Sequence, residues 1–322
     1  VELLARGGAE ASSAIEKDAQ RPLHIAAHFG HSALAAHLAS RGAEWSAITV
    51  SGSQPLHAAT QQGYSALTEH LARRGAEVRS STIWDSSQPI HMAANRGHVA
   101  VAEHLLRGPR RDGAALGAEA TAATNDGRQP LHVAVWPGGH LAFVVFLTEG
   151  ICRGGRCGGV EPSSTTQDGI QPLHIAAQEG DLAVAEYLAR RGAEASAITN
   201  DARQPLHIAA IKGHLAFVAH LTSRNAEPRP AKHGGSQPIH VAAQQGHIAV
   251  AEHLIRGGAG ARGAEASAAT DDGRQPLHVA VPGGHLVFVN FLMTRSQGGG
   301  VEPSSTTREW IQPLHIAAQA GH

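Results

Sequence analysis

The sequence predicts an all-α fold, a solenoid of stacked helix-turn-helix units. Two observations support this prediction: a Pro-(Leu/Ile)-His motif recurs along the whole chain, and small apolar residues dominate the 42% hydrophobic content. The motif proline stands at Pro22, Pro55, Pro89, Pro130, Pro172, Pro205, Pro238, Pro276 and Pro313. Successive intervals are 33, 34, 41, 42, 33, 33, 38 and 37 residues. A period of 33 lengthened by insertions indicates a repeat array rather than separate globular domains.

The first half of each copy predicts a short helix. In residues 204–213, Pro205 stands at the first helical position, where its fixed φ suits the helix and its missing N–H would have had no partner. The run Leu206–Ala210 continues the helix, and its two alanines allow a neighbouring helix to approach closely. Gly213 ends the helix, because glycine adopts the left-handed C-terminal conformation without strain.

The second half predicts another helix, over residues 214–224, since Leu215, Val218 and Leu221 fall on one face at helical spacing. A polar segment with turn residues then leads to the next Gln-Pro. Two helices this short are marginally stable alone. Each pair must therefore be sandwiched between neighbours, which explains why the copies come in series.

These motifs resemble the ankyrin repeat. Pro-Leu-His-x-Ala-Ala, a following Gly-His pair, a second helix and a Gly-Ala-Glu sequence recur from one end of the chain to the other. The resemblance implies an L-shaped unit of two antiparallel helices and a projecting finger, which is a loop or a short β-hairpin. It also implies a concave groove, lined by the fingers and the first helices, that holds other proteins.

The proline spacing predicts the repeat boundaries. We expect a partial repeat at 1–17 (second helix and finger), repeats at 18–50, 51–84, 85–125, 126–167, 168–200, 201–233, 234–271 and 272–308, and a partial repeat at 309–322; those starting at 85, 126, 234 and 272 carry insertions. The segment GGVEPSSTT occurs at 158–166 and again at 299–307, which indicates a duplicated four-repeat block. Neither end carries the polar cap usual for solenoids, so we expect a fragment of a longer array.

Composition argues against several classes of function. Lys+Arg is 26 against Asp+Glu 27, so no global charge attracts nucleic acid or anionic lipid. No apolar run approaches the 18 or so residues of a membrane span, and two cysteines are too few for a disulfide framework. We therefore expect an intracellular, cytoplasmic setting and no membrane insertion in this segment. We also expect that nucleic acid is not a favoured partner.

The chain departs from the ankyrin pattern before the motif proline, where the family usually has a threonine that caps the first helix. Here the position holds Arg21 in the first copy and glutamine in the others (Gln54, Gln88, Gln129, Gln171, Gln204, Gln237, Gln275 and Gln312). Glutamine is a poor N-cap, by roughly 0.5–1 kcal/mol. Our hypothesis is that its side-chain amide bonds the motif histidine or the backbone of a neighbouring finger.

The 23 histidines suggest metal binding, but their positions in the repeat indicate a structural role. Nine belong to the proline motif (His24, His57, His91, His132, His174, His207, His240, His278 and His315), seven to the Gly-His pair (His31, His98, His140, His214, His247, His285 and His322) and five to second helices (His37, His70, His104, His220 and His253). Only His28 and His233 fall outside these patterns. A zinc site needs about four converging ligands, and one histidine per layer does not converge, so we predict no metal and no cofactor.

The remaining motifs are weak. Cys152 and Cys157 are interpreted as incidental, with a labile disulfide as the alternative. The GAGARG sequence at 258–263 matches a dinucleotide-binding pattern but follows a helix rather than a strand. The insertions at 107–116, 151–159 and 257–261 are rich in Gly and Arg. We expect them to be exposed, mobile loops, and without interleaved aromatic residues we favour solvated linkers over RNA-binding sites.

The candidate binding residues are those at groove positions that stability does not dictate, since Trp and Arg are typical of binding hot spots. They are Trp84, Trp136, Trp310, Phe29, Arg96, Ile211, Lys212, Arg128, Arg203 and Arg274, with His28 and Asn95 beside them. For each tryptophan the alternative is that it packs on a neighbouring finger. No catalytic grouping is evident, and no small-molecule substrate is expected.

The sequence therefore predicts a non-enzymatic scaffold or adaptor that binds a protein partner of unknown identity. The alternative is a regulatory ankyrin segment of a larger enzyme or membrane channel. A third and weaker interpretation is RNA binding through the Arg-Gly loops.

Overall fold

A computed structural model describes residues 12–15, 18–108, 110–111, 114–115, 118–136, 138–153, 156–224, 226, 234–257, 264–295 and 301–321. The chain divides into two compact units, Val1–Gln167 and Asp168–His322. Each unit is a series of helix pairs, as the sequence predicts. The second helix expected within 1–17 falls mainly on residues outside the described ranges.

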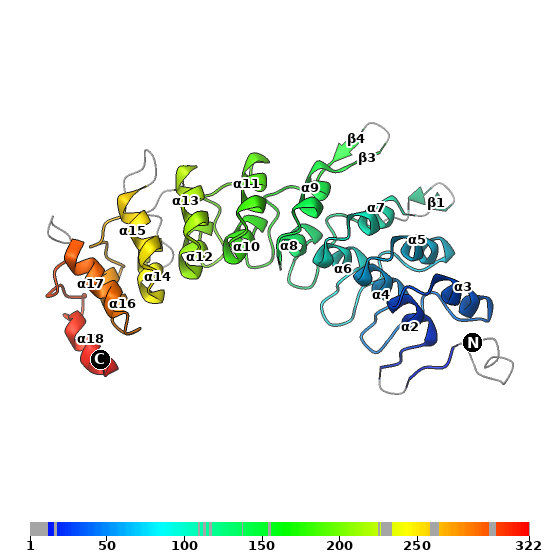
Figure 1. The fold of residues 1–322 in the computed structure, drawn as a ribbon, viewed down its shortest axis with the longest axis horizontal. Helices are drawn as coiled ribbons and strands as arrows, with labels where there is room; N and C mark the ends of the chain where they lie inside the picture. The colour runs from blue at the N-terminus through cyan, green and yellow to red at the C-terminus, as the bar shows by residue number, and fades with distance from the viewer. Residues whose placement is uncertain are drawn as a thin grey trace. The chain divides into compact units, whose positions relative to one another are not determined.

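The first unit stacks its helices in two rows (Figure 1). The first helices are α2 (Pro22–His28), α4 (Pro55–Gln62), α6 (Pro89–Arg96) and α8 (Pro130–Val135), and the second helices are α3 (Ser32–Ser40), α5 (Ser65–Arg74), α7 (Val99–Arg107) and α9 (Leu141–Glu149). Each first helix packs on the first helix of the next pair, and α7 packs on both α5 and α9.

Two of the insertions contain short strands rather than the irregular loops that their composition suggested. After α7, β1 (Arg110–Arg111) pairs antiparallel with β2 (Ala114–Ala115), and after α9, β3 (Ile151–Arg153) pairs antiparallel with β4 (Arg156–Gly158). Cys152 and Cys157 lie opposite each other in the second ladder. Most of the third insertion, with the GAGARG sequence, and His233 lie outside the described residues.

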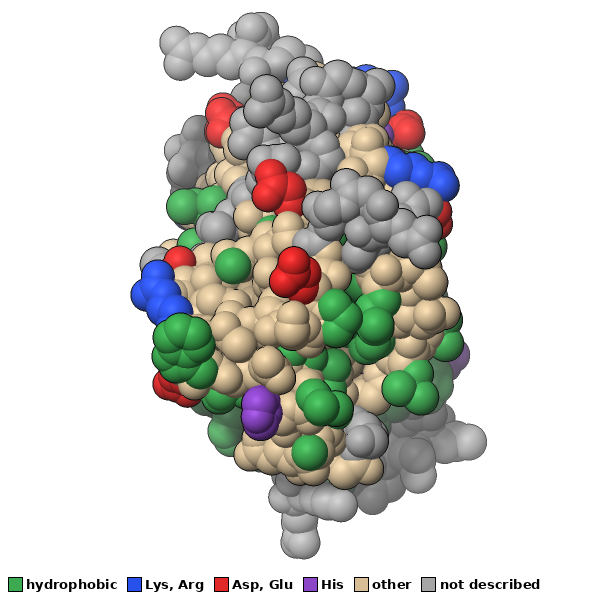
Figure 2. Space-filling model, turned by 90° about the vertical axis from the view of Figure 1, so that its left-hand side faces the viewer, with side chains coloured by type: hydrophobic (Ala, Val, Ile, Leu, Met, Phe, Trp, Pro, Cys, Tyr) green, Lys and Arg blue, Asp and Glu red, His purple; other side chains and the backbone are tan. Residues whose placement is uncertain are grey.

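The second unit repeats the arrangement. Its first helices are α10 (Pro172–Glu179), α12 (Pro205–Lys212), α14 (Pro238–Gln245), α16 (Pro276–Ala280) and α18 (Pro313–Ala320), and its second helices are α11 (Leu182–Arg190), α13 (Leu215–Ser223), α15 (Ile248–Arg256) and α17 (Leu286–Arg295). The first helices again pack in series from α10 to α18. Figure 2 views the end of this unit and shows hydrophobic side chains at its surface. Leu286, Val287 and Leu314 are among the exposed residues of this unit.

The core is a thin layer within each pair and between pairs. In the helices before α18, the motif leucines and the alanines two and three residues after the motif histidine are almost fully buried, as at Leu206, Ala209 and Ala210. Three second helices, α9, α13 and α17, each add a phenylalanine to this core. Phe143, Phe217 and Phe288 are the largest fully buried side chains among the described residues. Small residues at the helix contacts let the layers approach closely, because interior packing leaves few voids.

The start of each first helix is stabilised by the motif histidine. The backbone N–H of Gln171 donates to Nδ1 of His174 at 3.1 Å, and the other glutamine positions repeat this bond. The glutamine side chain makes no cap hydrogen bond. Of the two partners in our hypothesis, the histidine ring is bonded by the backbone N–H and not by the glutamine side chain. The Gln204 amide instead donates to the Ser196 carbonyl of the finger just before it, at 3.3 Å.

The end of most first helices is a glycine in the left-handed conformation, as Gly213 is at φ +75°. The helices α8 and α16 are shorter than their counterparts. Each carries the same Pro-Leu-His-Val-Ala-Val sequence followed closely by a second proline. An interior proline removes a backbone hydrogen bond and clashes with the preceding turn, so these two helices lose their last turn.

Candidate functional site

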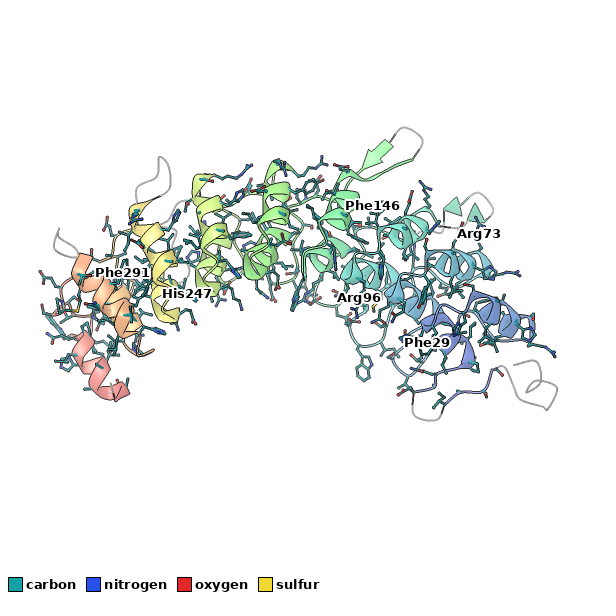
Figure 3. The ribbon with its side chains drawn as sticks, viewed as in Figure 1. Phe29, Arg73, Arg96, Phe146, His247 and Phe291 are labelled. Atoms are coloured by element: carbon teal, nitrogen blue, oxygen red, sulfur yellow. The ribbon has the colours of Figure 1, made fainter. Side chains whose placement is uncertain are left out.

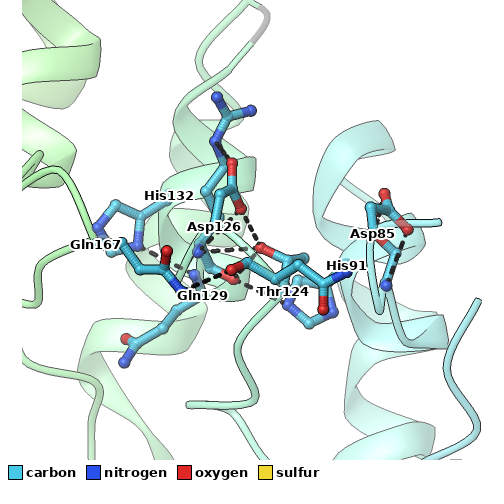
Figure 4. Close-up of polar contacts among 10 residues, drawn as sticks. Asp85, His91, Thr124, Asp126, Gln129, His132 and Gln167 are labelled. Carbon is cyan, nitrogen blue, oxygen red and sulfur yellow. Dashed lines mark hydrogen bonds and ion pairs between the residues drawn. The ribbon is translucent and has the colours of Figure 1, made fainter. Parts of the chain in front are cut away.

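We use "finger" for the segment between a second helix and the next first helix. Each described finger tip is closed by a turn, and a Thr–Asp–Arg set stabilises several of them. In finger 118–129, the Thr124 N–H donates to the Arg128 carbonyl at 2.9 Å, the Thr124 hydroxyl donates to Asp126, and Arg128 Nε pairs with Asp126 at 2.9 Å (Figure 4). The same set recurs in Thr199, Asp201 and Arg203 and in Thr270, Asp272 and Arg274.

Neighbouring finger tips are joined through their backbones. The Asn125 N–H donates to the Asp85 carbonyl at 2.9 Å, and the Gln167 N–H donates to the Asp126 carbonyl at 3.0 Å. In the second unit, the Arg308 N–H likewise donates to the Asp272 carbonyl at 3.0 Å. In the first unit the described fingers therefore form a continuous, pre-organised surface beside the first helices.

The motif histidines bind the following finger. Because Nδ1 of His91 accepts the Gln88 N–H, the ring proton lies on Nε2. Nε2 donates to the carbonyls of Ala122 and Arg128, at 3.0 and 3.2 Å (Figure 4). Burial lowers the pKa of His91, and it lowers that of His57 to about 4. They are neutral structural groups, and among the described residues no three His, Cys, Asp or Glu side chains gather as metal ligands would.

The Gly-His histidines bind in the opposite direction, to the preceding pair. Nε2 of His247 donates to the Ile211 carbonyl at 3.1 Å, and Nε2 of His140 donates to the Asn95 carbonyl at 2.9 Å. Such carbonyls lie in the last turn of a first helix, where no helical partner exists. Figure 3 shows His247 among the side chains of α14 and α15.

In the first unit, two pockets flank Trp84 on the finger side of the first helices. A pocket of 710 Å³ is lined by Asp18, Gln20, His24, Ile25, His28, Phe29, Thr49, Val50, Ser51, Ser53, Ala58, Gln61 and Trp84. A second, of 570 Å³, is lined by Trp84, Asp85, Ser87, His91, Met92, Asn95, Thr124, Asn125, Asp126, Arg128 and Val133. The structure therefore brings Phe29 and Arg128 to one surface with Trp84 between them. Arg96, the neighbour of Asn95, lies at the exposed end of α6 (Figure 3).

Two further candidates from the sequence meet directly. The guanidinium of Arg128 lies over the ring of Trp136, 4.8 Å from its centroid. Trp136 is the residue that follows the shortened α8, and it is 38% exposed. A guanidinium over an indole face is a favourable cation–π contact.

The second unit has its own pockets. One of 520 Å³ is lined by Asp168, Ile170, Gln178, Thr199, Asn200, Asp201, Arg203, Ile208, Ile211 and Lys212. The other, of 980 Å³, is lined by Gln244, Gln245, Asp271, Asp272, Arg274, His278, Val279, Pro282, Gly283, Thr307, Arg308, Glu309, Ile311, Ile316, Gln319 and Ala320. Arg203, Ile211 and Lys212 thus share one pocket, and Arg274 lines another. Trp310 lies in the finger beside that pocket without lining it.

Trp84 and Trp310 lie on fingers and are 76% and 81% exposed. Trp310 has a φ of +61°, at the turn position that other fingers fill with glycine (Gly52, Gly127, Gly169 and Gly273) or Ala202. Trp84 is an extra residue, since its finger is one residue longer than the 33-residue period requires. Neither finger turn requires a tryptophan, and most of each side chain is exposed to solvent. The alternative in which each tryptophan packs on a neighbouring finger therefore explains little of its position.

Sequence reasoning missed the residue directly after the motif histidine. This position lines all four pockets with half-exposed apolar side chains (Ile25, Ala58, Met92, Val133, Ile208, Val279 and Ile316). The signal was available: the position varies among apolar residues, whereas its neighbours keep His and Ala. The charged Asp271, Arg308 and Glu309 were missed as well.

Comparison with protein families agrees with this architecture. A model of ankyrin repeats matches three stretches of the chain, residues 56–155, 151–232 and 225–307. No curated protein matches the chain. Within the described ranges, no helix combines the length and the apolarity that crossing a membrane requires.

Proposed function

The chain belongs to the ankyrin-repeat family, and we propose that it is a protein-binding scaffold or adaptor whose partner docks on the pockets between its first helices and fingers. Ankyrin repeats are generally protein–protein interaction modules. In this proposal the chain catalyses no reaction, uses no cofactor and acts inside the cell, in the cytoplasm. The repeat boundaries predicted from the proline spacing are part of the same proposal.

One observation supports the proposal most strongly. Four pockets share the same construction, with a half-exposed apolar residue after the motif histidine as floor and polar finger residues as rim. Sites with an apolar centre and a polar rim are typical of protein interfaces. Most of the described motif and Gly-His histidines, which could have suggested chemistry, hold hydrogen bonds between repeats through Nε2, as His91 and His247 do.

We assign the partner-binding role to the exposed aromatic and charged residues of this surface. They are Trp84, Trp136, Trp310, Phe29, Arg96, Ile211, Lys212, Arg128, Arg203 and Arg274. Trp84 and Trp310 are the strongest, because a large apolar side chain left in solvent contributes to binding rather than to the fold. The three finger arginines have a second role, since each also pairs with the aspartate of its own turn.

Affinity capture from a cell extract, compared among variants, tests the proposal. We expect the chain to retain specific protein partners and expect Trp84→Ala and Trp310→Ala each to reduce their recovery at least fivefold, as loss of a hot spot does. Trp45→Ala is the matched control, because Trp45 packs against His70 (ring centroids 5.7 Å apart) and lines none of the four pockets. Circular dichroism confirms that the variants fold. Retention of all partners by both variants would refute the groove assignment.

A further inference from the structure

Two repeats of the chain are nearly identical at the site, apart from one tryptophan. Residues 130–141 read PLHVAVWPGGHL and residues 276–286 read PLHVAVPGGHL, so the second copy lacks only the counterpart of Trp136. The preceding finger tips also correspond, as Asp126-Gly127-Arg128 and Asp272-Gly273-Arg274. The pair is therefore a comparison, within one molecule, of the same site with and without an aromatic side chain.

With the tryptophan present, the arginine is partly covered. Trp136 lies 4.8 Å from the Arg128 guanidinium, which also pairs with Asp126, and the Arg128 side chain is 39% exposed. Without it, Arg274 keeps the same ion pair, at 2.9 Å to Asp272, but its side chain is 58% exposed. The finger holds both guanidinium groups in the same way, and the Arg274 guanidinium lacks the aromatic cover that Arg128 has.

The uncovered arginine lines the pocket of 980 Å³ in the second unit. The shortened α16 contributes to it, since Pro282 and Gly283 stand where a longer helix would continue. Val279 and Ile316 supply apolar floor on either side. The pocket thus combines the apolar walls that hold a ring with a cation placed to face it.

The rim of this pocket is slightly acidic. Asp271, Asp272 and Glu309 face Arg274 and Arg308, which leaves one net negative charge while His278 is neutral, as burial lowers its pKa. In the part of the chain that the structure describes, neither Asp271 nor Glu309 has an ion-pair partner. A basic residue beside the incoming ring would complement both carboxylates.

We propose that this pocket, called here the Arg274 pocket, takes an aromatic side chain of a partner protein that is flanked by lysine or arginine. The partner's ring stacks on Arg274 as Trp136 stacks on Arg128. The inference rests on the proposed function, which it deepens by naming the chemistry of the partner. It concerns a site distinct from the exposed tryptophans of the fingers.

The test uses the whole chain and a minimal probe, the blocked tripeptide acetyl-Lys-Trp-Lys-amide, with acetyl-Lys-Ala-Lys-amide as the matched peptide. In a ¹H–¹⁵N NMR titration we expect the tryptophan peptide to shift the Gly283 amide and the Arg274 Nε–H saturably at millimolar concentration. The alanine peptide should leave both signals in place. Absence of a saturable shift, or equal shifts with the two peptides, would overturn the proposal.

Two variants locate the binding. Inserting a tryptophan between Val281 and Pro282 recreates the 130–141 sequence, and it should raise the thermal midpoint and abolish the peptide shifts. Arg274→Gln should weaken binding about two- to fivefold, the size of an exposed cation–π contact, whereas Arg256→Gln, on α15 and lining none of the four pockets, should not. Undiminished binding to the insertion variant, once its folding is verified by its NMR spectrum, would contradict the assignment.

A reciprocal variant separates this inference from the proposed function. Deleting Trp136 should open the equivalent site over Arg128 and create peptide-induced shifts there. If no peptide binds but protein partners are still captured through Trp84 and Trp310, the Arg274 assignment fails while the scaffold function stands. If the peptide binds and no protein is captured, the Arg274 pocket does take a basic aromatic peptide, but the scaffold function fails and with it the claim that the ligand belongs to a partner protein.

Discussion

At the scale of single residues, histidine joins each repeat to both neighbours. A motif histidine such as His174 accepts the Gln171 N–H on Nδ1 and donates from Nε2 to the Ala197 carbonyl of the next finger at 3.1 Å. A Gly-His histidine such as His247 donates backward to the Ile211 carbonyl. Only the neutral ring suits the first role, because protonated Nδ1 would present a second proton to an N–H donor.

This geometry predicts that the array loses stability in mild acid. Burial lowers the pKa of His24, His57, His91, His174, His240 and His278 below the ordinary value of 6.5. Between pH 6.5 and about 4, the value for His57, the unfolded chain binds more protons than the folded chain, so stability must fall as pH falls. The thermal midpoint should drop steadily from pH 7 to pH 5. The finger aspartates titrate below 3.8 and do not contribute in that window. A midpoint independent of pH over this range would refute the role given to the buried rings.

The glutamine before the motif proline is predicted to be a weak cap. Gln204 makes no side-chain cap bond, and its amide has only a 3.3 Å contact to Ser196. Gln204→Thr should therefore stabilise the chain by about 0.5–1 kcal/mol, because threonine would accept a first-turn N–H. Urea denaturation measures the change. A loss of stability would mean that the glutamine side chain supports the finger more than its single weak contact indicates.

At the scale of elements, the glycine turn between the two helices of one pair leaves room for the Gly-His histidine ring of the next pair. A Cβ built on Gly213 would lie 2.8 Å from the His247 ring, and one on Gly180 would lie 2.8 Å from the His214 ring. The glycine thus meets two requirements, a positive φ and room for a ring. Sequence reasoning explained the first from helix termination, but the second depends on the neighbouring repeat.

A pair of glycine variants separates these two requirements. Gly213→Ala should be more destabilising than Gly192→Ala, although both have positive φ (+75° and +97°), because a Cβ on Gly192 meets nothing within 4 Å. Left-handed strain alone costs about 1–2 kcal/mol, and displacement of the His247 ring adds to it in Gly213→Ala. Chemical denaturation of both variants gives the difference. Equal costs would show that the ring yields without penalty.

The finger that carries Trp310 is predicted to be under strain. Its φ of +61° is one that bulky residues rarely adopt. Trp310→Gly should raise the free energy of unfolding by up to about 1 kcal/mol, since strain of about 1–2 kcal/mol is relieved and part of it is offset by chain entropy. Ala202→Gly, at the same turn position with φ +57°, should give a similar gain. A stability loss in Trp310→Gly alone would mean that the indole packs on the protein and is not held out for a partner.

At the scale of the whole molecule, each helix pair is stabilised by packing on its neighbouring pairs. Each first helix contacts those before and after it within its unit, and none has an independent core. Such arrays follow nearest-neighbour energetics, in which an interior pair supports two interfaces and a peripheral pair supports one. Exposed aromatic residues and open pockets can be tolerated on this frame because the interfaces, not the groove, hold it together.

This connectivity predicts different effects for one substitution at two positions. Leu206 and Leu314 occupy the same motif position, but Leu206 is fully buried and Leu314 is 74% exposed. Leu206→Ala should cost about 2–5 kcal/mol and speed amide exchange from α10 to α14. Leu314→Ala should cost less than about 1 kcal/mol and affect only α18. Native-state hydrogen exchange reports both. Equal effects at the two positions would contradict a repeat-by-repeat distribution of stability.

The proposed binding surface, in contrast, was predicted only as individual residues. The sequence marked Arg128 and Trp136 separately, and their stacking at 4.8 Å became visible only in three dimensions. It also marked Phe29 and Trp84 without showing that they line one pocket. The half-exposed residues after the motif histidines were missed, because one repeat read alone does not show which helix face its neighbours leave open.

The sequence by itself determined the period of the array, the start of each first helix at proline and the glycine that ends it. These signals act within a few residues, and a 33-residue unit contains all of them. Only the tertiary structure decided where each histidine donates, which finger carbonyl it meets and which side chains share a pocket. Those contacts join groups 23 to 45 residues apart. They depend on how one repeat is offset on the next, and this offset is set by packing between repeats rather than by any local pattern.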